Sequence, residues 1–330
     1  MKIKRGLSLV VGIVVSTMFI MGMLQYGLVV SAQPVNNSVP AELEPVGNDT
    51  RLTSSGPITI YLPAVFRRAG INLKKGIGAV VAPACVDMDS MLASWYLNWQ
   101  PAPDPTCAPA DDRFVPRIGS TAAMARLAEG VANAQYSGWL IGFNEPNLPF
   151  QTDISPAQAA VLWKQIEAAA IPAGVKLVSP GPSQDNPGEL DPYGNQWLWA
   201  MVDAYKNLYG TNPHFDAIGW NLYGCTNHPN CLDVAEMKAF LTQRRQEAQN
   251  RGYDVPIWIL ELGGCQTDNS LGSDLVIMTE MATWFDATPW IDRYAWFSNR
   301  TATTFQGNHN CILVNGDGTL TTLGTTYKAQ

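Results

Sequence analysis

The chain has 330 residues, of which 46% are hydrophobic, so it is long enough to bury a large core. Its formal net charge is −7, and only 15% of its residues are charged. An acidic chain of this kind lacks the basic surface that nucleic acid requires, so nucleic-acid partners are excluded.

The first 32 residues have the pattern of a secretory signal. Residues 1–5 are basic, residues 6–30 form an almost charge-free apolar run, and Ser31-Ala32 offers a cleavage site. Cleavage would remove three basic residues and no acid, leaving 18 of the 21 basic residues against 28 acids, a net charge of −10. The apolar run is long for a signal, so an uncleaved membrane anchor through residues 6–30 is the alternative. In both cases the rest of the chain is exported, and we expect a secreted, extracellular protein with no stable membrane partner once the signal is removed.

Residues 33–74 are predicted to connect this signal to the folded domain. Residues 33–56 are rich in Pro, Asn and Gly without hydrophobic periodicity, which indicates a disordered leader. A short apolar segment at 58–66 then leads into a domain predicted to span residues 75–330.

In that domain, short apolar runs alternate with helical segments. The runs are almost continuously apolar, which is typical of strands buried on both faces of a parallel sheet. Ser155 followed by Pro156 is a favourable helix start. The eight predicted strands are 76–81, 95–99, 114–118, 139–143, 175–179, 215–222, 256–260 and 293–297, and the clearest helices are 121–134, 155–170 and 234–251.

Alternation of this kind over about 250 residues predicts an α/β fold, either a (β/α)8 TIM barrel or a doubly wound sheet. No G-x-G-x-x-G motif follows the first run, which weakens a nucleotide-binding doubly wound sheet. We therefore expect one TIM barrel.

Two predicted strands end in a glutamate. Glu145 follows the fourth strand in the segment Asn144-Glu145-Pro146, and Glu261 ends the seventh. An acid beside a buried strand is costly unless it is paired or functional. One such acid is explained equally well by a structural salt bridge. Two of them across one barrel mouth predict a pair of catalytic carboxylates.

These motifs resemble those of clan A glycoside hydrolases, and further segments narrow the resemblance to glycoside hydrolase family 128, the Asl1-like catalytic domains. The resemblance covers about residues 75–330. Asn221 is a departure, since family members commonly carry His there, and Leu260 and Leu262 replace more polar or aromatic neighbours. The matching segments are Trp95-Tyr96-Leu97-Asn98-Trp99, Phe114-Val115-Pro116, Val178-Ser179-Pro180, Asp216-Ala217-Ile218, Tyr223-Gly224, Arg293-Tyr294-Ala295-Trp296-Phe297 and Leu320-Thr321-Thr322-Leu323-Gly324.

The resemblance implies cleavage of β-1,3-glucan with retention at the anomeric carbon and without a cofactor. By matched position, Glu145 would be the general acid/base, Glu261 the nucleophile, and Asn144 would bond the sugar 2-hydroxyl. Such a reaction needs the two carboxyl groups roughly 5 Å apart.

Other side chains at the strand ends are predicted to bind the polysaccharide. Trp99, Tyr223 and Trp296 are candidate sugar platforms, with packing of the barrel top as the alternative. Asn98 is expected to be a site residue rather than a turn residue. Asn221 keeps the capacity for hydrogen bonds but cannot titrate as His does.

Six cysteines in an exported chain favour disulfides, although sequence alone leaves fifteen connectivities. A zinc site is disfavoured because the chain has only three His and no C-x-x-C pair. If a barrel is assumed, all six follow strands on the catalytic side, and neighbouring loops can meet. We then expect the pairs Cys85–Cys107, Cys225–Cys231 and Cys265–Cys311.

Three functional alternatives stay open. The chain could act on another β-linked polysaccharide, act as a transglycosylase with the same residues, or be a non-catalytic carbohydrate-binding surface protein. The presence of both Glu145 and Glu261 argues against the last. Asn-x-Ser/Thr occurs at Asn36, Asn48 and Asn299, a weak pattern for glycosylation.

Overall fold

A computed structural model of the chain describes residues 72–184, 194–226, 232–264, 271–300 and 311–330. All of these residues belong to one compact unit, Ala64–Gln330. The predicted signal, the leader and the segment 58–66 lie outside the described residues. None of the described helices is both long and apolar enough to cross a membrane.

Parallel strands form the centre of this unit and confirm the predicted α/β class. Five of them form one sheet in the order β2-β1-β7-β6-β5, and β3 pairs with β4. Their bounds are β1 Asn72–Gly78, β2 Ala93–Leu97, β3 Trp139–Ile141, β4 Lys176–Val178, β5 Ile218–Tyr223, β6 Ile257–Gly263 and β7 Ile291–Phe297.

The predicted strand at 114–118 is present only as isolated parallel bridges. On one side, Val115 N donates to Tyr96 O of β2 at 2.9 Å, and on the other Ile141 N of β3 donates to Pro116 O at 2.9 Å. Pro116 has no N–H and cannot continue a ladder, which explains why the segment forms bridges but no regular strand. A further parallel bridge joins Val178 of β4 to Ala217, just before β5.

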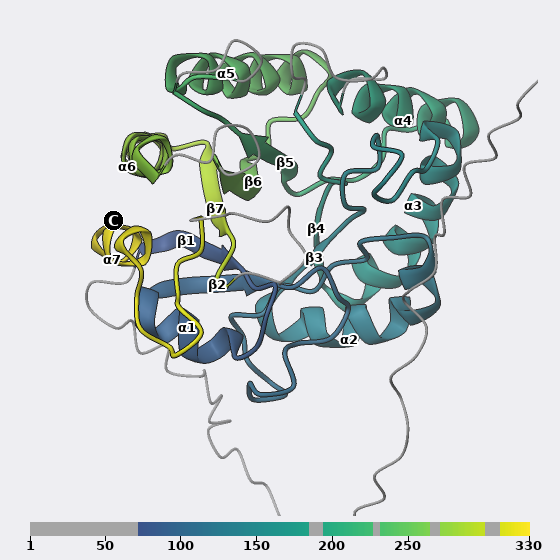
Figure 1. The fold of residues 1–330 in the computed structure, drawn as a ribbon. Coiled ribbons are helices and arrows are strands. Elements are labelled where there is room, and N and C mark those ends of the chain that lie inside the picture. The colour runs from purple at the N-terminus through teal and green to yellow at the C-terminus, as the bar shows by residue number, and fades with distance from the viewer. Residues whose placement is uncertain (1–71, 185–193, 227–231, 265–270, 301–310) are drawn as a thin grey trace, which may run out of the picture. The chain divides into compact units, whose positions relative to one another are not determined.

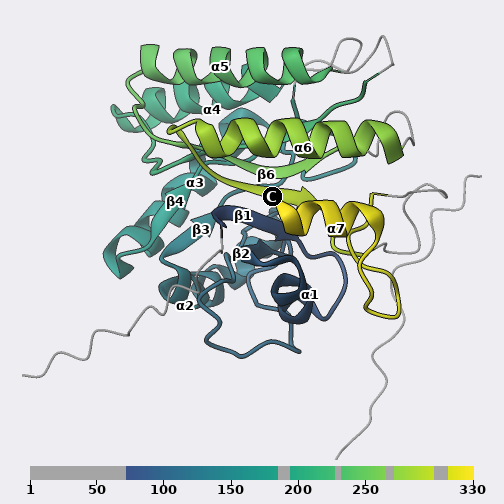
Figure 2. The ribbon, with the colours of Figure 1, turned by 90° about the vertical axis from the view of Figure 1, so that its left-hand side faces the viewer.

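Helices lie around the outside of these strands, as Figure 1 shows. Figure 2 shows α6 and α7 next to one another, in agreement with their mutual contacts. The predicted start of α3 is confirmed, since the Ser155 side chain accepts a hydrogen bond from Gln158 N and Pro156 is the first helical residue. The bounds are α1 Ala84–Met91, α2 Leu127–Ser137, α3 Pro156–Ala170, α4 Gly194–Tyr209, α5 Val234–Asn250, α6 Leu271–Ala287 and α7 Thr322–Ala329, with short 3₁₀ turns η1 Ala122–Arg126 and η2 Ile171–Ala173.

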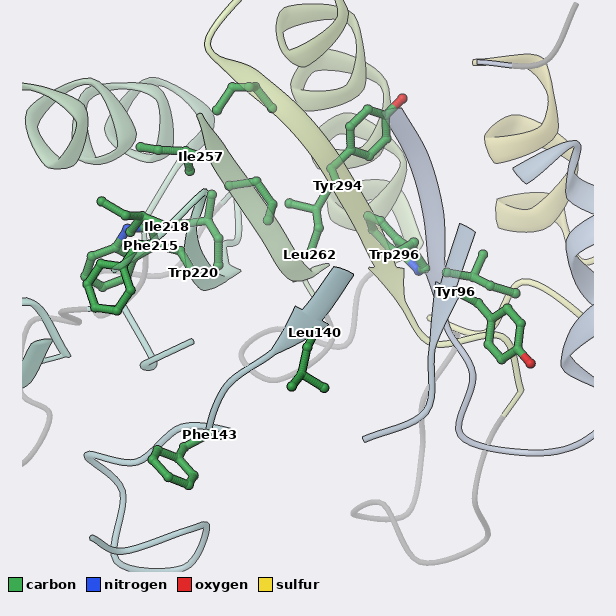
Figure 3. Packing of buried hydrophobic residues seen from close by; sticks show 14 of the residues in the cluster. Tyr96, Leu140, Phe143, Phe215, Ile218, Trp220, Ile257, Leu262, Tyr294 and Trp296 are labelled. Atoms are coloured by element: carbon green, nitrogen blue, oxygen red, sulfur yellow. The ribbon is translucent and has the colours of Figure 1, made fainter. Parts of the chain in front are cut away.

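The strands separate two apolar clusters because successive side chains point to opposite faces. The larger cluster fills the space between strands and helices and includes Trp220, Tyr294 and Trp296, which are labelled in Figure 3. The smaller cluster lies on the opposite face. Its buried members are Trp95, Leu97, Val115, Ile141, Val178, Ala217, Trp258, Leu260 and Ala295.

A glycine and an arginine shape this smaller cluster. A Cβ on Gly76 would lie 2.3 Å from the Trp95 ring, so only glycine leaves room for that indole. The guanidinium carbon of Arg293 lies 4.5 Å from the ring centroid of Trp258, within the range of a cation–π contact.

Candidate active site

A groove of about 430 Å³ opens beside the C-terminal ends of the strands. Both predicted carboxylates, those of Glu145 and Glu261, line this groove, although Glu145 is only 5% exposed and Glu261 only 4%. The full lining consists of Val80, Trp99, Gln100, Gly119, Ser120, Asn144, Glu145, Phe150, Gln151, Thr152, Tyr223, Glu261 and Phe297.

Glu261 reaches the groove because of an irregularity in β6. Along the β5–β6 pair, Trp220 pairs with Ile259 and the next residue, Asn221, pairs with Glu261, so Leu260 is an extra residue in β6. Strict alternation would place Glu261 on the same face as Ile259, which belongs to the cluster that packs against the helices. The extra residue therefore re-aims the Glu261 side chain, as β-bulges near active sites do.

Two hydrogen-bond donors and one cation surround the Glu261 carboxylate. Trp99 Nε1 donates to Oε1 at 2.7 Å, and the Tyr223 hydroxyl donates to Oε2 at 2.6 Å. Arg117 Nη1 lies 3.7 Å from Oε1. An ionised carboxylate can only accept hydrogen bonds, and in a buried site these two donors and the nearby cation would stabilise its negative charge.

Arg117 is a site residue that sequence reasoning missed. It is fully buried, and its Nε and Nη2 each donate at 3.0 Å, to Gly142 O and Phe143 O. Burial lowers the pKa of Arg117 to about 10, while the charges of Glu261 and Glu145 oppose that shift. A signal was available, because a lone arginine inside the apolar run 114–118 is as costly as a lone acid.

Glu145 follows β3 in a left-handed backbone conformation, with φ at 38°. Its backbone N donates to Gly181 O at 2.9 Å and its backbone O accepts from Leu148 N at 3.0 Å, so the surrounding chain holds this strained residue in place. Strain of this kind is concentrated at functional sites.

Electrostatics connect the two glutamates through their shared neighbours. The pKa of Tyr223 is raised well above its ordinary value, first by burial and then by the charges of Glu261 and Glu145. The charges of the same two carboxylates act on Arg117. Glu145 and Glu261 therefore lie around one buried arginine and one buried hydroxyl.

Asn144 and Asn221 lie one behind the other. Asn144 lines the groove, and its Nδ2 donates to Gln151 Oε1 at 3.3 Å. Asn221 is fully buried on β5, and its Nδ2 donates to Asn144 Oδ1 at 3.5 Å. Asn221 does not line the groove, so the predicted substrate contact is replaced by a supporting role behind Asn144.

Two of the three predicted aromatic platforms reach the groove. Trp99 and Tyr223 line it, but Trp296 is fully buried between strands and helices, where its Nε1 donates to Cys311 O at 2.9 Å. The prediction for Trp296 is therefore corrected. Because side chains alternate along β7, the next residue, Phe297, lines the groove instead.

Asn98 stabilises a turn after β2. Its Nδ2 donates to Ala102 O at 3.0 Å and its Oδ1 accepts from Gln100 N at 3.1 Å, and the residue does not line the groove. Both ends of the amide are thus used within the chain. This geometry favours the turn role over the predicted substrate contact.

The cysteines differ in part from the predicted pairing. Cys85 and Cys107 are adjacent but are free thiols: Cys107 Sγ accepts from Cys85 N at 3.0 Å, while Cys85 Sγ faces Thr106 O at 3.6 Å. The Cys107 sulfur thus faces the start of α1 and accepts a hydrogen bond from the backbone of that helix. Cys225 and Cys311 each take part in a disulfide bond. Their predicted partners, Cys231 for Cys225 and Cys265 for Cys311, lie outside the described residues.

The loop after Glu145 supplies groove residues that the sequence did not reveal, namely Phe150, Gln151 and Thr152. The Thr152 hydroxyl lies 2.6 Å from both Gly119 O and Asn144 O, which ties this loop to the neighbouring segment. Loop residues show no hydrophobic periodicity, so the only sequence signal that could have found them is their position shortly after a catalytic candidate. No group of side chains able to hold a metal ion occurs among the described residues.

Several solved structures resemble this chain. An endo-β-1,3-glucanase of glycoside hydrolase family 128, subgroup II, from Sorangium cellulosum shares 27% identity at a TM-score of 0.62, over 78% of this chain and 98% of that chain. One of the same subgroup from Pseudomonas viridiflava shares 28% identity at a TM-score of 0.60, over 78% of this chain and 97% of that chain. A subgroup I variant from Amycolatopsis mediterranei, in complex with laminaripentaose, shares 25% identity at a TM-score of 0.61, over 78% of this chain and 99% of that chain.

These likenesses confirm the resemblance to glycoside hydrolase family 128. Among curated proteins, no relative matches the chain. The family model described as glycosyl hydrolase catalytic core matches residues 79–327. The chain therefore belongs to the glycosyl hydrolase catalytic core family and is a glycoside hydrolase.

Proposed function

We propose that the chain is a secreted, retaining β-1,3-glucanase in which Glu145 is the general acid/base and Glu261 the nucleophile. The observation that carries this proposal is the surrounding of Glu261: two donors at 2.7 and 2.6 Å hold its carboxylate at the groove that Glu145 also lines. The similar structures support the substrate class, since they are β-1,3-glucanases and several hold laminari-oligosaccharides.

The same proposal includes a closed (β/α)8 barrel. Bridges place the segment 114–118 between β2 and β3, and Val178–Ala217 places β4 beside β5. Together with the pairing of β1 to β7 and β2, these contacts support a ring of eight parallel segments. In such a barrel, the C-terminal strand ends surround one active site.

Each proposed step uses a group already described. The Glu261 carboxylate attacks the anomeric carbon while Glu145 gives its proton to the leaving oxygen, so the glycosidic bond breaks and a glycosyl ester forms on Glu261. Water then attacks the same carbon, Glu145 takes the proton, and the ester bond to Glu261 breaks. Two displacements leave the anomeric configuration unchanged.

The surrounding residues prepare these steps. Trp99 and Tyr223 fix both oxygens of Glu261, and Arg117 balances its charge at 3.7 Å. Once Glu261 is esterified, its negative charge is gone, which favours release of the proton from Glu145. Asn144, held by Asn221, is the group we assign to the sugar 2-hydroxyl.

Cleavage of a panel of β-1,3-, β-1,4- and mixed-linkage glucans tests substrate and linkage together. We expect β-1,3-glucan to be cleaved, with the β-anomer as the first product by NMR. An initial α-anomer would contradict the retaining mechanism, and cleavage confined to another linkage would contradict the substrate.

Substitution of the two carboxylates tests their roles. Glu145→Gln and Glu261→Ala should each lower kcat by at least about 10²-fold with unchanged circular dichroism. Glu280→Gln is the control, because the Glu280 side chain is 55% exposed on α6 and does not line the groove. Full activity of either active-site variant would overturn the assignment of that residue.

A further inference from the structure

Phe150 is an apolar side chain held out into water at the edge of the groove. Its exposed fraction is 74%, the largest among the exposed large apolar side chains of the described residues. Single exposed apolar residues are common on protein surfaces, so exposure alone carries no meaning. Phe150 differs because it lines the same groove as Glu145 and Glu261, which are almost completely buried.

The loop that carries Phe150 is fixed by hydrogen bonds before and after the ring. Before it, Leu148 N donates to Glu145 O at 3.0 Å. After it, Gln151 N donates to Leu148 O at 3.1 Å, and the Thr152 hydroxyl lies 2.6 Å from Asn144 O. The backbone on both sides of Phe150 is therefore tied to the segment that carries the acid/base candidate. A ligand that covers the ring would lose little free energy in ordering this loop.

The chemistry beside Phe150 is that of a sugar-binding surface. A flat aromatic ring covers the apolar C–H face of a pyranose, while amides bond the hydroxyl groups at its edge. The Gln151 and Asn144 amides, joined at 3.3 Å, lie on the same groove. The position is at the rim, whereas the carboxylates are buried, so this ring is suited to a sugar unit outside the two that flank the cleaved bond.

We infer that Phe150 is the platform of a further sugar-binding subsite and that it makes the enzyme favour longer glucan chains. This inference rests on the proposed function, because it takes the groove to bind a chain of linked sugars. It predicts a dependence on chain length that the carboxylates alone would not produce.

The test compares Phe150→Ala and Phe150→Tyr in the full-length protein on β-1,3-gluco-oligosaccharides of increasing length. For long substrates, Phe150→Ala should lower kcat/KM by about 10-fold, mainly by raising KM, with a smaller loss on the shortest substrate cleaved. Phe150→Tyr, which keeps the ring, should recover most of the loss. Tyr136→Ala is the control, since Tyr136 is 53% exposed on α2 and does not line the groove.

Equal losses on all chain lengths, or no loss at all, would overturn the inference. A wild-type melting temperature for Phe150→Ala would show that the effect is not one of folding. If that variant is unstable, Phe150→Tyr and Phe150→Leu decide, because only the aromatic substitution should retain the length dependence.

A binding measurement separates this inference from the proposed function. Calorimetric titration of Glu261→Gln and of the double variant Glu261→Gln/Phe150→Ala with the panel oligosaccharides requires no turnover. About 10-fold weaker binding by the double variant supports the platform even if the wild type cleaves no β-1,3-glucan, a result that would contradict only the proposed function. Equal binding by both proteins, or no binding by either, would overturn the platform.

Discussion

One arginine connects the two halves of the proposed active site. The Arg117 guanidinium donates to the carbonyls of Gly142 and Phe143, which precede Glu145 by three and two residues, respectively, and it lies beside Glu261. Gly181 leaves space for it, because a Cβ there would lie 2.9 Å from Arg117 Nη2. The planar fork of the guanidinium allows these contacts at once, and a lysine has no equivalent geometry.

Arg117→Lys should therefore lower kcat at least about 10-fold while keeping the positive charge. Arg117→Met should also destabilise the fold by about 3 kcal/mol or more, because it removes a hydrogen-bond donor from two buried carbonyls and the neighbouring cation from a buried carboxylate. Urea unfolding and steady-state kinetics on the same preparations check both effects. Wild-type kinetics for Arg117→Met would contradict the role we give to this residue.

Asn299 carries a glycosylation pattern that the fold makes unusable. The residue is fully buried, its Nδ2 donates to Asp87 Oδ2 at 2.8 Å, and its Oδ1 accepts from Val80 N at 2.9 Å. A glycan attached to Nδ2 would disrupt the hydrogen bond to Asp87, and the buried position of Asn299 leaves no space for a sugar. We expect active protein from a eukaryotic secretory host to carry no glycan at Asn299, as glycopeptide mass spectrometry can check. A glycan at that position in active protein would contradict the structure.

At the scale of elements, the sequence predicted which segments form strands better than it predicted where their side chains point. Apolar runs identified β1 to β7, because burial on both faces requires them. The bulge at Leu260, and the face of the sheet toward which each β7 side chain points, left no such signal. Both depend on how the strand pairs with its neighbours. Trp296 was therefore expected at the sugar-binding end of its strand although it is buried, whereas Phe297, which lines the groove, was not singled out.

The junction between α1 and the loop after β2 yields a prediction on thiol chemistry. Burial raises the pKa of Cys107 to about 12, with the neighbouring Cys85 side chain as a further cause. Little thiolate then exists at pH 8, and iodoacetamide should alkylate Cys107 in the native protein far more slowly than in urea. Peptide mapping without reduction should find Cys85 and Cys107 unlinked. A Cys85–Cys107 linked peptide would contradict the structure and restore the pairing expected from the sequence.

The same thiol has a defined effect on stability at high pH. In the unfolded chain it ionises near 9.0, and in the folded protein only at about 12, so the unfolded chain releases its proton first as pH rises. The contribution is complete below about pH 9 and is lost between about pH 9 and 12. The free energy of unfolding of Cys107→Ala should fall less steeply than that of the wild type over this range. Parallel pH profiles of the two proteins would contradict this linkage.

For the whole molecule, the described fold is held together by contacts between its first and last segments. β1 pairs with both β2 and β7, and the Tyr327 hydroxyl of α7 donates to Gly76 O at 2.6 Å. Lys75 Nζ donates to Tyr327 O at 3.0 Å, at the C-terminal end of the same helix, where a cation is favourable. Sequence periodicity reveals the parts of such a fold, but these long-range contacts belong to no single segment, so the sequence indicated neither α7 as the partner of β1 nor the start of β1 at Asn72.

These contacts set the smallest chain that should fold. The family model begins at residue 79 and the sequence predicted a domain from residue 75, but Asn72 Nδ2 donates to Asp286 Oδ2 at 2.8 Å and Lys74 Nζ to Phe285 O at 2.8 Å. A variant that begins at residue 72 should unfold cooperatively and keep the activity of a variant that begins at residue 33. One that begins at residue 75 should be less stable, because it leaves the end of α6 without these two partners. One that begins at residue 79 should fail to fold, because β2 and β7 lose the strand between them. Thermal unfolding by circular dichroism ranks the three, and a stable, active chain beginning at residue 79 would show that β1 is dispensable.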